Sequence, residues 1–262
     1  MLALILLCCK KNSEKAETAV TEIPMNEYTE QAVLWQQHAA EYRALAYQAY
    51  NIARLRLKDY LDKEGAQTRH PAVITDIDET VLDNSPFAAK LIEVDSAYTR
   101  SRWLEWGRLA RADTIPGSLG FFRYAAENGV EIFYISNRYA EQLAVTIKNL
   151  QKWGYPFADD THVLLMKNSG GKEARRRLVE ENHDIILLIG DNLADFSNLF
   201  DVTGSSRRSA VADSLQTEFG RQFIVLPNPV YGDWETKGIF GGKPHLNPAQ
   251  QDSIRRASLQ SF

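Results

Sequence analysis

Hydrophobic and polar residues follow two different patterns along the chain. From Thr29 to Leu61 there is no Gly or Pro, and apolar residues recur at helical spacing. This pattern predicts one long amphipathic helix, or two, within about residues 28–62. Gly65 and the polar residues after it end the helical pattern.

After Pro71 the pattern changes to short apolar runs separated by helical stretches. The runs are rich in β-branched residues and predict buried strands; they lie at 72–77, 131–136, 162–166, 185–191 and 223–227. Helices are predicted between them at 117–128, 141–153 and 171–182. Strands that alternate with helices indicate an α/β fold, with a Rossmann-type parallel sheet of about five strands covered by helices on both faces.

Residues 88–115 do not fit this alternation. Their aromatic residues Tyr98, Trp103 and Trp106 predict a small helical cap that is inserted over the functional site. At 262 residues and 44% hydrophobic content, the chain is long enough for one sizeable core. We therefore expect a single domain over 23–262 that carries both the cap and the N-terminal helices.

The charge pattern argues against binding to duplex nucleic acid. The formal net charge is −4, and Arg175, Arg176 and Arg177 have glutamates nearby in the sequence. No basic face of the required size is predicted.

Residues 1–22 resemble the end of a secretory signal followed by a tether. Cys8 and Cys9 are the only cysteines, and they follow the apolar run Leu2–Leu7. Leu6 stands three residues before Cys9, as a lipid-attachment site requires, so Cys9 is favoured over Cys8 as the lipid-bearing residue. Six apolar residues cannot span a bilayer, which needs about 20 helical residues. We expect an exported, lipid-anchored protein; a cytosolic N-terminus with two incidental cysteines ranks second.

Acidic residues follow two of the predicted strands. Asp76 and Asp78 end the first strand, and Asp191 ends the fourth, with Asp195 one turn further on. Because the carboxyl ends of parallel strands meet at one edge of a sheet, these carboxylates are expected to converge. Carboxylates so close together repel each other, and a cation, or a division into one ionised and one protonated acid, relieves the repulsion.

Groups that can bind an anion are expected at the same edge. Ser136 and Asn137 follow the second strand, and Lys172 begins a helix. This set suits a phosphate monoester together with a divalent metal: oxygen ligands from Asp76 and Asp191 favour Mg²⁺, while Lys172 and Ser136 can face phosphate oxygens. Asp78 would begin protonated, give its proton to the leaving oxygen and later take one from water.

Five segments together resemble a known family. DIDETVLDNSPF, YISNR, GGKEARR, GDNLADF and FIVLPNPVYGDWE are similar to the four motifs and the C-terminal signature of the class C acid phosphatases. These are bacterial surface lipoproteins of the lipoprotein e type, within the haloacid dehalogenase (HAD) superfamily. The resemblance covers nearly all of the folded chain and implies a HAD-like fold.

The resemblance also implies roles for the four aspartates. Asp76 matches the nucleophile that becomes an aspartyl phosphate, and Asp78 matches the general acid and base, whose main-chain carbonyl also ligates Mg²⁺. Asp191 matches the second metal carboxylate. Asp195 matches the last acid of the signature, which supports the metal site.

Further positions are implied for substrate binding. Ser136, Asn137 and Lys172 match phosphate-binding residues. In relatives that hydrolyse nucleoside monophosphates, two aromatic residues sandwich the base; Tyr231 matches one of them, and Tyr98 is a weaker match for the other.

Some positions leave alternatives open. Lys167 competes with Lys172 for the phosphate-binding role, and Phe87 stands where the family often has tyrosine. Asp83 and Asn84 are interpreted as turn and helix-capping residues.

The resemblance implies a Mg²⁺-dependent acid phosphatase that acts on nucleoside 5′-monophosphates and other small phosphate monoesters, with an acidic optimum, and it makes a homodimer reasonable. Two other hypotheses use the same scaffold. One is a surface protein that binds a nucleotide or haem without turnover, and the other is a phosphotransferase.

Overall fold

The structure is a computed structural model, and it describes residues 24–64, 70–168 and 170–262. The signal-like segment and Cys9 lie outside this range. Among the described residues, no helix has both the length and the apolar character needed to cross a bilayer.

Five parallel strands form the central sheet, in the order β5-β4-β1-β6-β7. Their bounds are β1 (Pro71–Thr75), β4 (Glu131–Tyr139), β5 (Val163–Met166), β6 (Asp184–Gly190) and β7 (Phe223–Val225). The predicted α/β class with five strands is confirmed. From β1 the chain adds strands first on one side and then, with β6, on the other, so a crevice opens between the carboxyl ends of β1 and β6.

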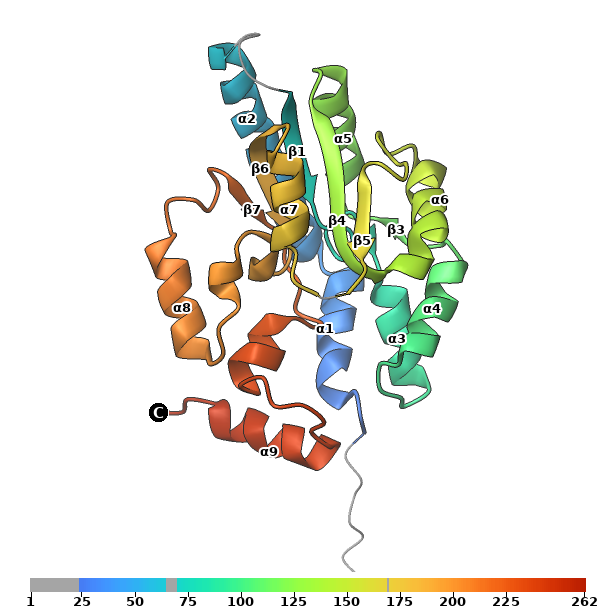
Figure 1. The fold of residues 1–262 in the computed structure, drawn as a ribbon. Coiled ribbons are helices and arrows are strands. Elements are labelled where there is room, and N and C mark those ends of the chain that lie inside the picture. The colour runs from blue at the N-terminus through green and yellow to red at the C-terminus, as the bar shows by residue number, and fades with distance from the viewer. Residues whose placement is uncertain (1–23, 65–69, 169) are drawn as a thin grey trace, which may run out of the picture.

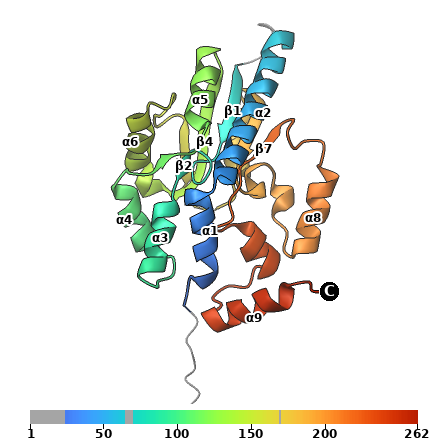
Figure 2. The same ribbon diagram turned by 180° about the vertical axis from the view of Figure 1, so that it is seen from behind.

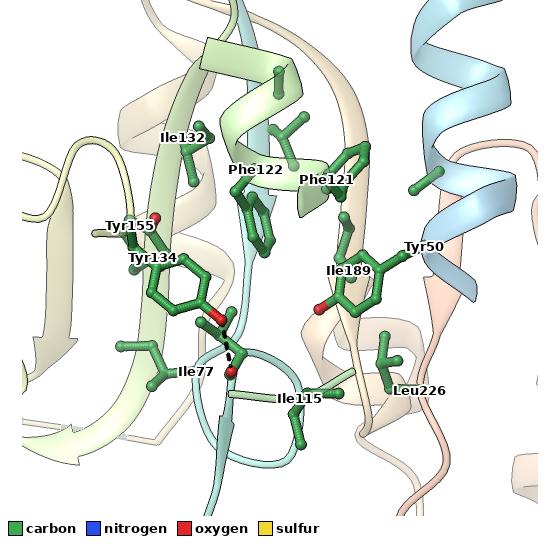
Figure 3. Packing of buried hydrophobic residues seen from close by; sticks show 14 of the residues in the cluster. Tyr50, Ile77, Ile115, Phe121, Phe122, Ile132, Tyr134, Tyr155, Ile189 and Leu226 are labelled. Atoms are coloured by element: carbon green, nitrogen blue, oxygen red, sulfur yellow. Dashed lines mark hydrogen bonds between the residues drawn. The ribbon is translucent and has the colours of Figure 1, made fainter. Parts of the chain in front are cut away.

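Helices cover both faces of the sheet, as Figures 1 and 2 show from opposite sides. On one face α2 (Ala40–Glu64) and α5 (Ser118–Glu127) pack against the strands, and on the other lies α7 (Glu173–Glu180). In the larger core, Phe122 of α5 contacts both Tyr134 of β4 and Tyr50 of α2 (Figure 3). This two-sided burial explains why the strand sequences are apolar throughout.

The N-terminal helical region consists of two helices. α1 (Glu27–His38) and α2 are separated at Ala39, whose backbone is extended (φ −73°, ψ 128°). The break lets α1 leave the sheet and lie beside α3 (Ser85–Glu93), where the Gln36 amide donates to Asp83 at 2.8 Å.

The cap segment, residues 88–115, contains most of α3 and all of α4 (Arg100–Arg108). A short antiparallel pair, β2 (Leu82–Asp83) and β3 (Asp113–Thr114), closes its base. Strands of two residues carry no detectable periodicity, which explains why this pair was not predicted.

The remaining helices are α6 (Leu143–Trp153), α8 (Ser205–Ser214) and α9 (Pro248–Ser258), with 3-10 turns η1 (Ala140–Gln142), η2 (Leu193–Asp195) and η3 (Asn198–Phe200) and a π-helix η4 (Trp234–Ile239). The sequence pattern predicts no helix at α8, η4 or α9. In Figure 1, α1, α3, α4 and α9 gather beyond the carboxyl ends of the strands.

Candidate active site

Three carboxylates meet where β1 and β6 end. Asp76 follows β1 and its N–H donates to the Ile189 carbonyl of β6 at 2.8 Å. Asp191 follows β6, and Asp195 ends η2. One carboxylate oxygen from each of the three aspartates lies within 4.8 Å of the others. We call Asp76, Asp191 and Asp195 the acid cluster.

The local sequence holds Asp195 in this cluster. Its carboxylate accepts the Asn192 N–H at 3.0 Å, which closes the η2 turn. Gly190 leaves room for the turn, because a Cβ at this position would overlap the Asp195 side chain. In the GDN sequence, the glycine therefore leaves the space that the tight turn and the Asp195 side chain require.

Lys172 is the cation of the cluster. It stands at the N-cap of α7, is buried, and contacts Asp76 as well as Asp195, the latter at 2.6 Å. Burial disfavours its ammonium form, but Asp195 and Asp76 together raise the pKa of Lys172 above its ordinary value. Lys167, the competing candidate, is exposed to solvent.

The single positive charge of Lys172 does not balance the three carboxylates of the acid cluster. Burial raises the pKa of Asp76 well above its ordinary value, an effect that Lys172 offsets and that Asp195 and Asp191 strengthen. Burial, with Asp195 nearby, raises the pKa of Asp191 to about 7. In the protein without a metal, proton binding is thus favoured where negative charge accumulates.

The donor set of the acid cluster fits a hard divalent cation. Three carboxylates and one ammonium leave two negative charges in excess, and all the donor atoms are oxygens. Thr80 and Asn228 fix the Asp191 side chain, donating at 3.1 and 2.7 Å. Such outer hydrogen bonds orient a metal ligand.

The Asp78 carboxylate forms its hydrogen bonds with residues outside the acid cluster. Its carboxylate accepts hydrogen bonds from Asn84 at 2.8 Å and from Ser136 at 3.1 Å, and forms a salt bridge with Arg138 at 2.8 Å. The first two aspartates of the motif therefore occupy different electrostatic surroundings.

Ser136 and Asn137, the two residues expected to bind phosphate after the second strand, lie within β4, which continues to Tyr139, and they differ in their contacts. Ser136 is fully buried, and its hydroxyl contacts Asp78 and accepts the Arg138 N–H at 3.1 Å. Asn137 is exposed, and its amide oxygen accepts from Arg175 at 2.7 Å. Both line the cavity described next.

A cavity of about 730 Å³ opens above the acid cluster, a volume typical of small-molecule sites. Tyr98 of the cap segment and Tyr231, which follows β7, are about half exposed and line it. The Tyr98 hydroxyl lies 3.3 Å from that of Tyr139, and Tyr231 is bonded through its hydroxyl to the buried Glu79. The structure thus brings both predicted aromatic residues to the cavity that holds Asp76.

Two arginines make contacts that the sequence pattern does not predict. Arg175 has glutamates nearby in the sequence, but it donates to the carbonyl of Ser136 at 2.6 Å and so braces β4. Arg176 is buried and donates to the carbonyls of Ala194 and Asp195 at 3.0 and 2.9 Å. Their helical spacing after Lys172 was the available signal, because residues 172 and 176 share one face of α7.

The prediction that Asn84 is a helix-capping residue is confirmed for its position but not for its side chain. Asn84 occupies the N-cap of α3, but its side chain makes no capping hydrogen bond. Asp83 instead accepts the Ser85 N–H at 2.8 Å. The Asn84 amide is directed to Asp78, a contact that only the folded chain reveals.

The sequence was compared with known families and curated proteins. The family model of the HAD superfamily, subfamily IIIB (Acid phosphatase), matches residues 5–234. The chain is 29% identical over 161 residues to a stem 31 kDa glycoprotein of Glycine max and 26% identical over 166 residues to vegetative storage protein 2 of Arabidopsis thaliana. These matches cover 59% and 60% of this chain, and 57% and 55% of the plant proteins. The chain therefore spans little more than half the length of these relatives.

The structure was compared with solved structures. It is similar to the class C acid phosphatase from Bacillus anthracis, with 41% sequence identity and a TM-score of 0.87. A tungstate-bound structure of that phosphatase gives 40% and 0.86. Both cover 92% of this chain and the whole of the matched chain.

Proposed function

The chain belongs to the acid phosphatases of HAD subfamily IIIB, and from this premise we propose that it is a Mg²⁺-dependent phosphomonoesterase that hydrolyses nucleoside 5′-monophosphates through an aspartyl-phosphate intermediate. The resemblance drawn from the sequence motifs is confirmed at the level of the family, and so is the HAD-like fold.

The single observation that carries the proposal is the acid cluster with Lys172 at the crevice between β1 and β6. A phosphate dianion approaches a carboxylate nucleophile only where positive charge offsets their repulsion. Lys172 supplies one charge. Asp76, Asp191 and Asp195, with the main-chain carbonyl of Asp78, would hold Mg²⁺, which when bound supplies the remaining positive charge.

The proposed roles of the protein groups combine the family resemblance with their positions in the cavity. An oxygen of Asp76 forms the new P–O bond, and the bond from phosphorus to the leaving oxygen breaks. Asp78, two residues further on, gives that oxygen a proton and later takes one from the water that hydrolyses the aspartyl phosphate. Lys172 and Asn137, both on the cavity wall, donate hydrogen bonds to the phosphoryl oxygens.

Ser136 acts differently in this proposal. Its hydroxyl is already occupied by Asp78 and by the Arg138 N–H. The hydroxyl can donate to a phosphate oxygen only after it rotates away from Asp78. This rotation leaves one lone pair of the Asp78 carboxylate without a donor.

The dimensions and aromatic residues of the cavity support a nucleotide substrate. Tyr98 and Tyr231 line it from different segments, and half-exposed rings give a base two surfaces on which to stack. The tungstate bound to the Bacillus anthracis protein is a tetrahedral oxyanion like phosphate, which supports an oxyanion site in this fold.

The proposed setting is the bacterial cell envelope. Export and attachment of a lipid to Cys9 rest on the sequence of residues 1–22. Charged nucleotides cross membranes poorly, so a surface phosphatase would release nucleosides for uptake.

A substrate panel tests the proposal. Release of inorganic phosphate is measured from AMP, nicotinamide mononucleotide and p-nitrophenyl phosphate, with Mg²⁺ or with EDTA. We expect hydrolysis of all three, preference for the nucleotides, and loss of activity in EDTA. Activity that persists in EDTA would remove the metal, and equal rates on all three would remove the nucleotide preference. Transfer of phosphate to added glycerol in place of its release would favour the phosphotransferase, and binding of nucleotide or haem without release would favour the binding protein.

A further inference from the structure

The Asp78 carboxylate is held by more donors than a freely rotating acid would have. Its Oδ1 accepts from Asn84 Nδ2 at 2.8 Å, Arg138 Nη2 at 2.8 Å and Arg138 Nε at 3.0 Å. Its Oδ2 has longer contacts, with Ser136 Oγ at 3.1 Å and Arg138 Nε at 3.2 Å. We infer that Asn84 and Arg138 are positioning residues for proton transfer by Asp78. Two tryptophans of α4 hold these residues in place: Trp106 holds Asn84, and Trp103 holds Arg138. This inference rests on the proposed phosphatase activity.

The Asn84 amide has only one workable orientation. It is buried, and its Oδ1 accepts the indole N–H of Trp106 at 2.8 Å. An indole N–H can only donate, so the oxygen must face Trp106 and the NH₂ must face Asp78. Trp106 therefore determines that Asn84 donates a hydrogen bond to the acid.

Arg138 fixes the plane of the carboxylate. Its guanidinium is buried, meets Asp78 through Nε and Nη2, and donates from Nη1 to Thr146 at 3.2 Å. The Trp103 ring lies over it, with 5.6 Å from the guanidinium carbon to the ring centroid. A planar guanidinium held by Thr146 and Trp103 orients the Asp78 carboxylate more strictly than the single ammonium of a lysine would.

These contacts assign different tasks to the two oxygens of Asp78. Oδ1 receives the three shorter hydrogen bonds and acts as the anchor. Oδ2 has the weaker contacts and carries the proton that is transferred. When Asp76 attacks phosphorus, the P–O bond to the leaving group breaks, its electron pair stays on the leaving oxygen, and that oxygen takes the proton from Oδ2 of Asp78.

The cap segment thereby becomes part of the proton-transfer apparatus. Trp103 and Trp106 are three residues apart on α4, so both project from one side of this helix. The sequence pattern predicts for them only a place in the cap. In the structure each of them contacts a different side chain that binds Asp78.

The test compares two substrates of similar size that differ in their need for a proton. p-Nitrophenyl phosphate releases a phenolate that is stable without protonation, whereas benzyl phosphate releases an alkoxide that requires one. The value of kcat/KM reports the step that expels the leaving group. The ratio of the two values therefore measures proton donation separately from phosphate binding, and neither substrate carries a nucleobase.

We expect Asn84→Ala and Arg138→Lys to lower kcat/KM for benzyl phosphate by about 10²-fold, in the range of general acid catalysis. The loss for p-nitrophenyl phosphate should stay below about 10-fold. Trp106→Phe keeps an aromatic ring and removes only the N–H donor, and it should lower the value for benzyl phosphate alone, by about 3- to 10-fold. Because this change is small, it keeps the inference testable if the first two variants fold poorly.

Trp153→Phe is the matched control. The Trp153 indole N–H donates to the Ala112 carbonyl at 2.9 Å, away from Asp78, so its loss should leave the substrate ratio unchanged. Equal losses on both substrates, or an unchanged ratio in the Asn84, Arg138 and Trp106 variants, would overturn the inference while the phosphatase activity stands. Failure of the unmodified protein to hydrolyse either substrate would overturn the proposed function itself.

Discussion

The two ends of the cavity carry charge in different ways. At the inner end, the acid cluster has three carboxylates and a single ammonium, Lys172. At the outer end the charged residues are Asp201, Asp233, Glu235, Lys237 and Arg255, which we call the outer wall. There, Lys237 contacts Asp201 at 2.6 Å and Asp233 at 2.8 Å, and Arg255 contacts Glu235 at 2.8 Å.

This difference distinguishes the groups that take part in the chemistry from those that give the cavity its shape. Charges of the outer wall satisfy one another, and Arg208 near Asp233 adds a third base to its three acids. The inner end is left with excess negative charge that only a proton or an external cation can neutralise. An excess of one sign of charge among buried groups costs free energy, so it indicates a functional centre. A network in which acids and bases balance indicates a wall that bounds the substrate.

The largest expected effect comes from the nucleophile. Asp76→Asn removes the attacking carboxylate and should lower kcat by about 10³-fold or more, as for other covalent catalysts. Phosphate release from AMP under saturating Mg²⁺ measures it.

Asp201→Asn provides the comparison at the outer wall. Lys237 retains Asp233 as a partner, so we expect kcat within about threefold of the unmodified protein. A similar fall in both variants would show that the two ends of the cavity do not differ as described. Full activity in Asp76→Asn would exclude the covalent mechanism.

Metal removal should affect stability in a pH-dependent way. Burial raises the pKa of Asp191 to about 7 from an ordinary value of 3.8, so between these values the folded state binds a proton that the unfolded state does not. The metal-free protein should therefore be more stable at pH 5 than at pH 8, because this contribution is lost as pH rises through about 7. Thermal melting in EDTA at the two pH values measures the difference.

Asp191→Asn is the control for this pH effect. The amide does not titrate, so the difference between the two melting temperatures should shrink. Saturating Mg²⁺ should stabilise the unmodified protein more at pH 8 than at pH 5, because protons and metal compete for the same oxygens. A metal-free protein that melts higher at pH 8 would contradict the assignment.

The sequence predicted the inner end of the cavity better than the outer end, for a physical reason. Asp76 and Asp191 directly follow apolar strands and Ser136 lies near the carboxyl end of another, and a parallel sheet brings such ends together whatever the loops do. Their positions therefore follow from strand periodicity alone.

The outer wall depends on segments without such a pattern. Glu235 lies in the π-helix η4, and Arg255 lies on α9, a helix with no buried residue in its own sequence span. Arg255 reaches its position through Glu235 and the rings of Tyr28 and Phe240. Contacts between residues separated by more than 200 positions, such as Tyr28 with Arg255, are not encoded in local periodicity.

Removal of an aromatic ring should have an intermediate effect. Tyr231→Ala deletes a half-exposed ring from the cavity. It should raise KM for AMP by about 3- to 10-fold, the range expected for loss of one aromatic stacking contact. KM for p-nitrophenyl phosphate, which has no base, should change less.

Tyr47→Ala is the matched control, because Tyr47 on α2 is similarly exposed and does not line the cavity. It should leave both KM values unchanged. Tyr231→Phe keeps the ring but loses the hydroxyl that contacts Glu79, and so tests whether this anchor orients the ring. Equal KM increases for both substrates in Tyr231→Ala would place Tyr231 outside a base site.

The smallest effect is expected at the outer wall itself. Arg255→Met keeps an unbranched apolar chain against Tyr28 and Phe240 and removes the guanidinium that contacts Glu235. A partly exposed pair of this kind contributes about 1 kcal/mol or less to the free energy of unfolding, which corresponds to about 2–4 °C in Tm for a domain of this size. We expect Tm to fall within this range, with kcat on p-nitrophenyl phosphate unchanged, because a self-neutralised wall takes no part in the chemistry. If kcat fell more than tenfold without a larger loss of Tm, Arg255 would act on the reacting groups, and the balance of charge at the outer wall would no longer indicate a purely structural role.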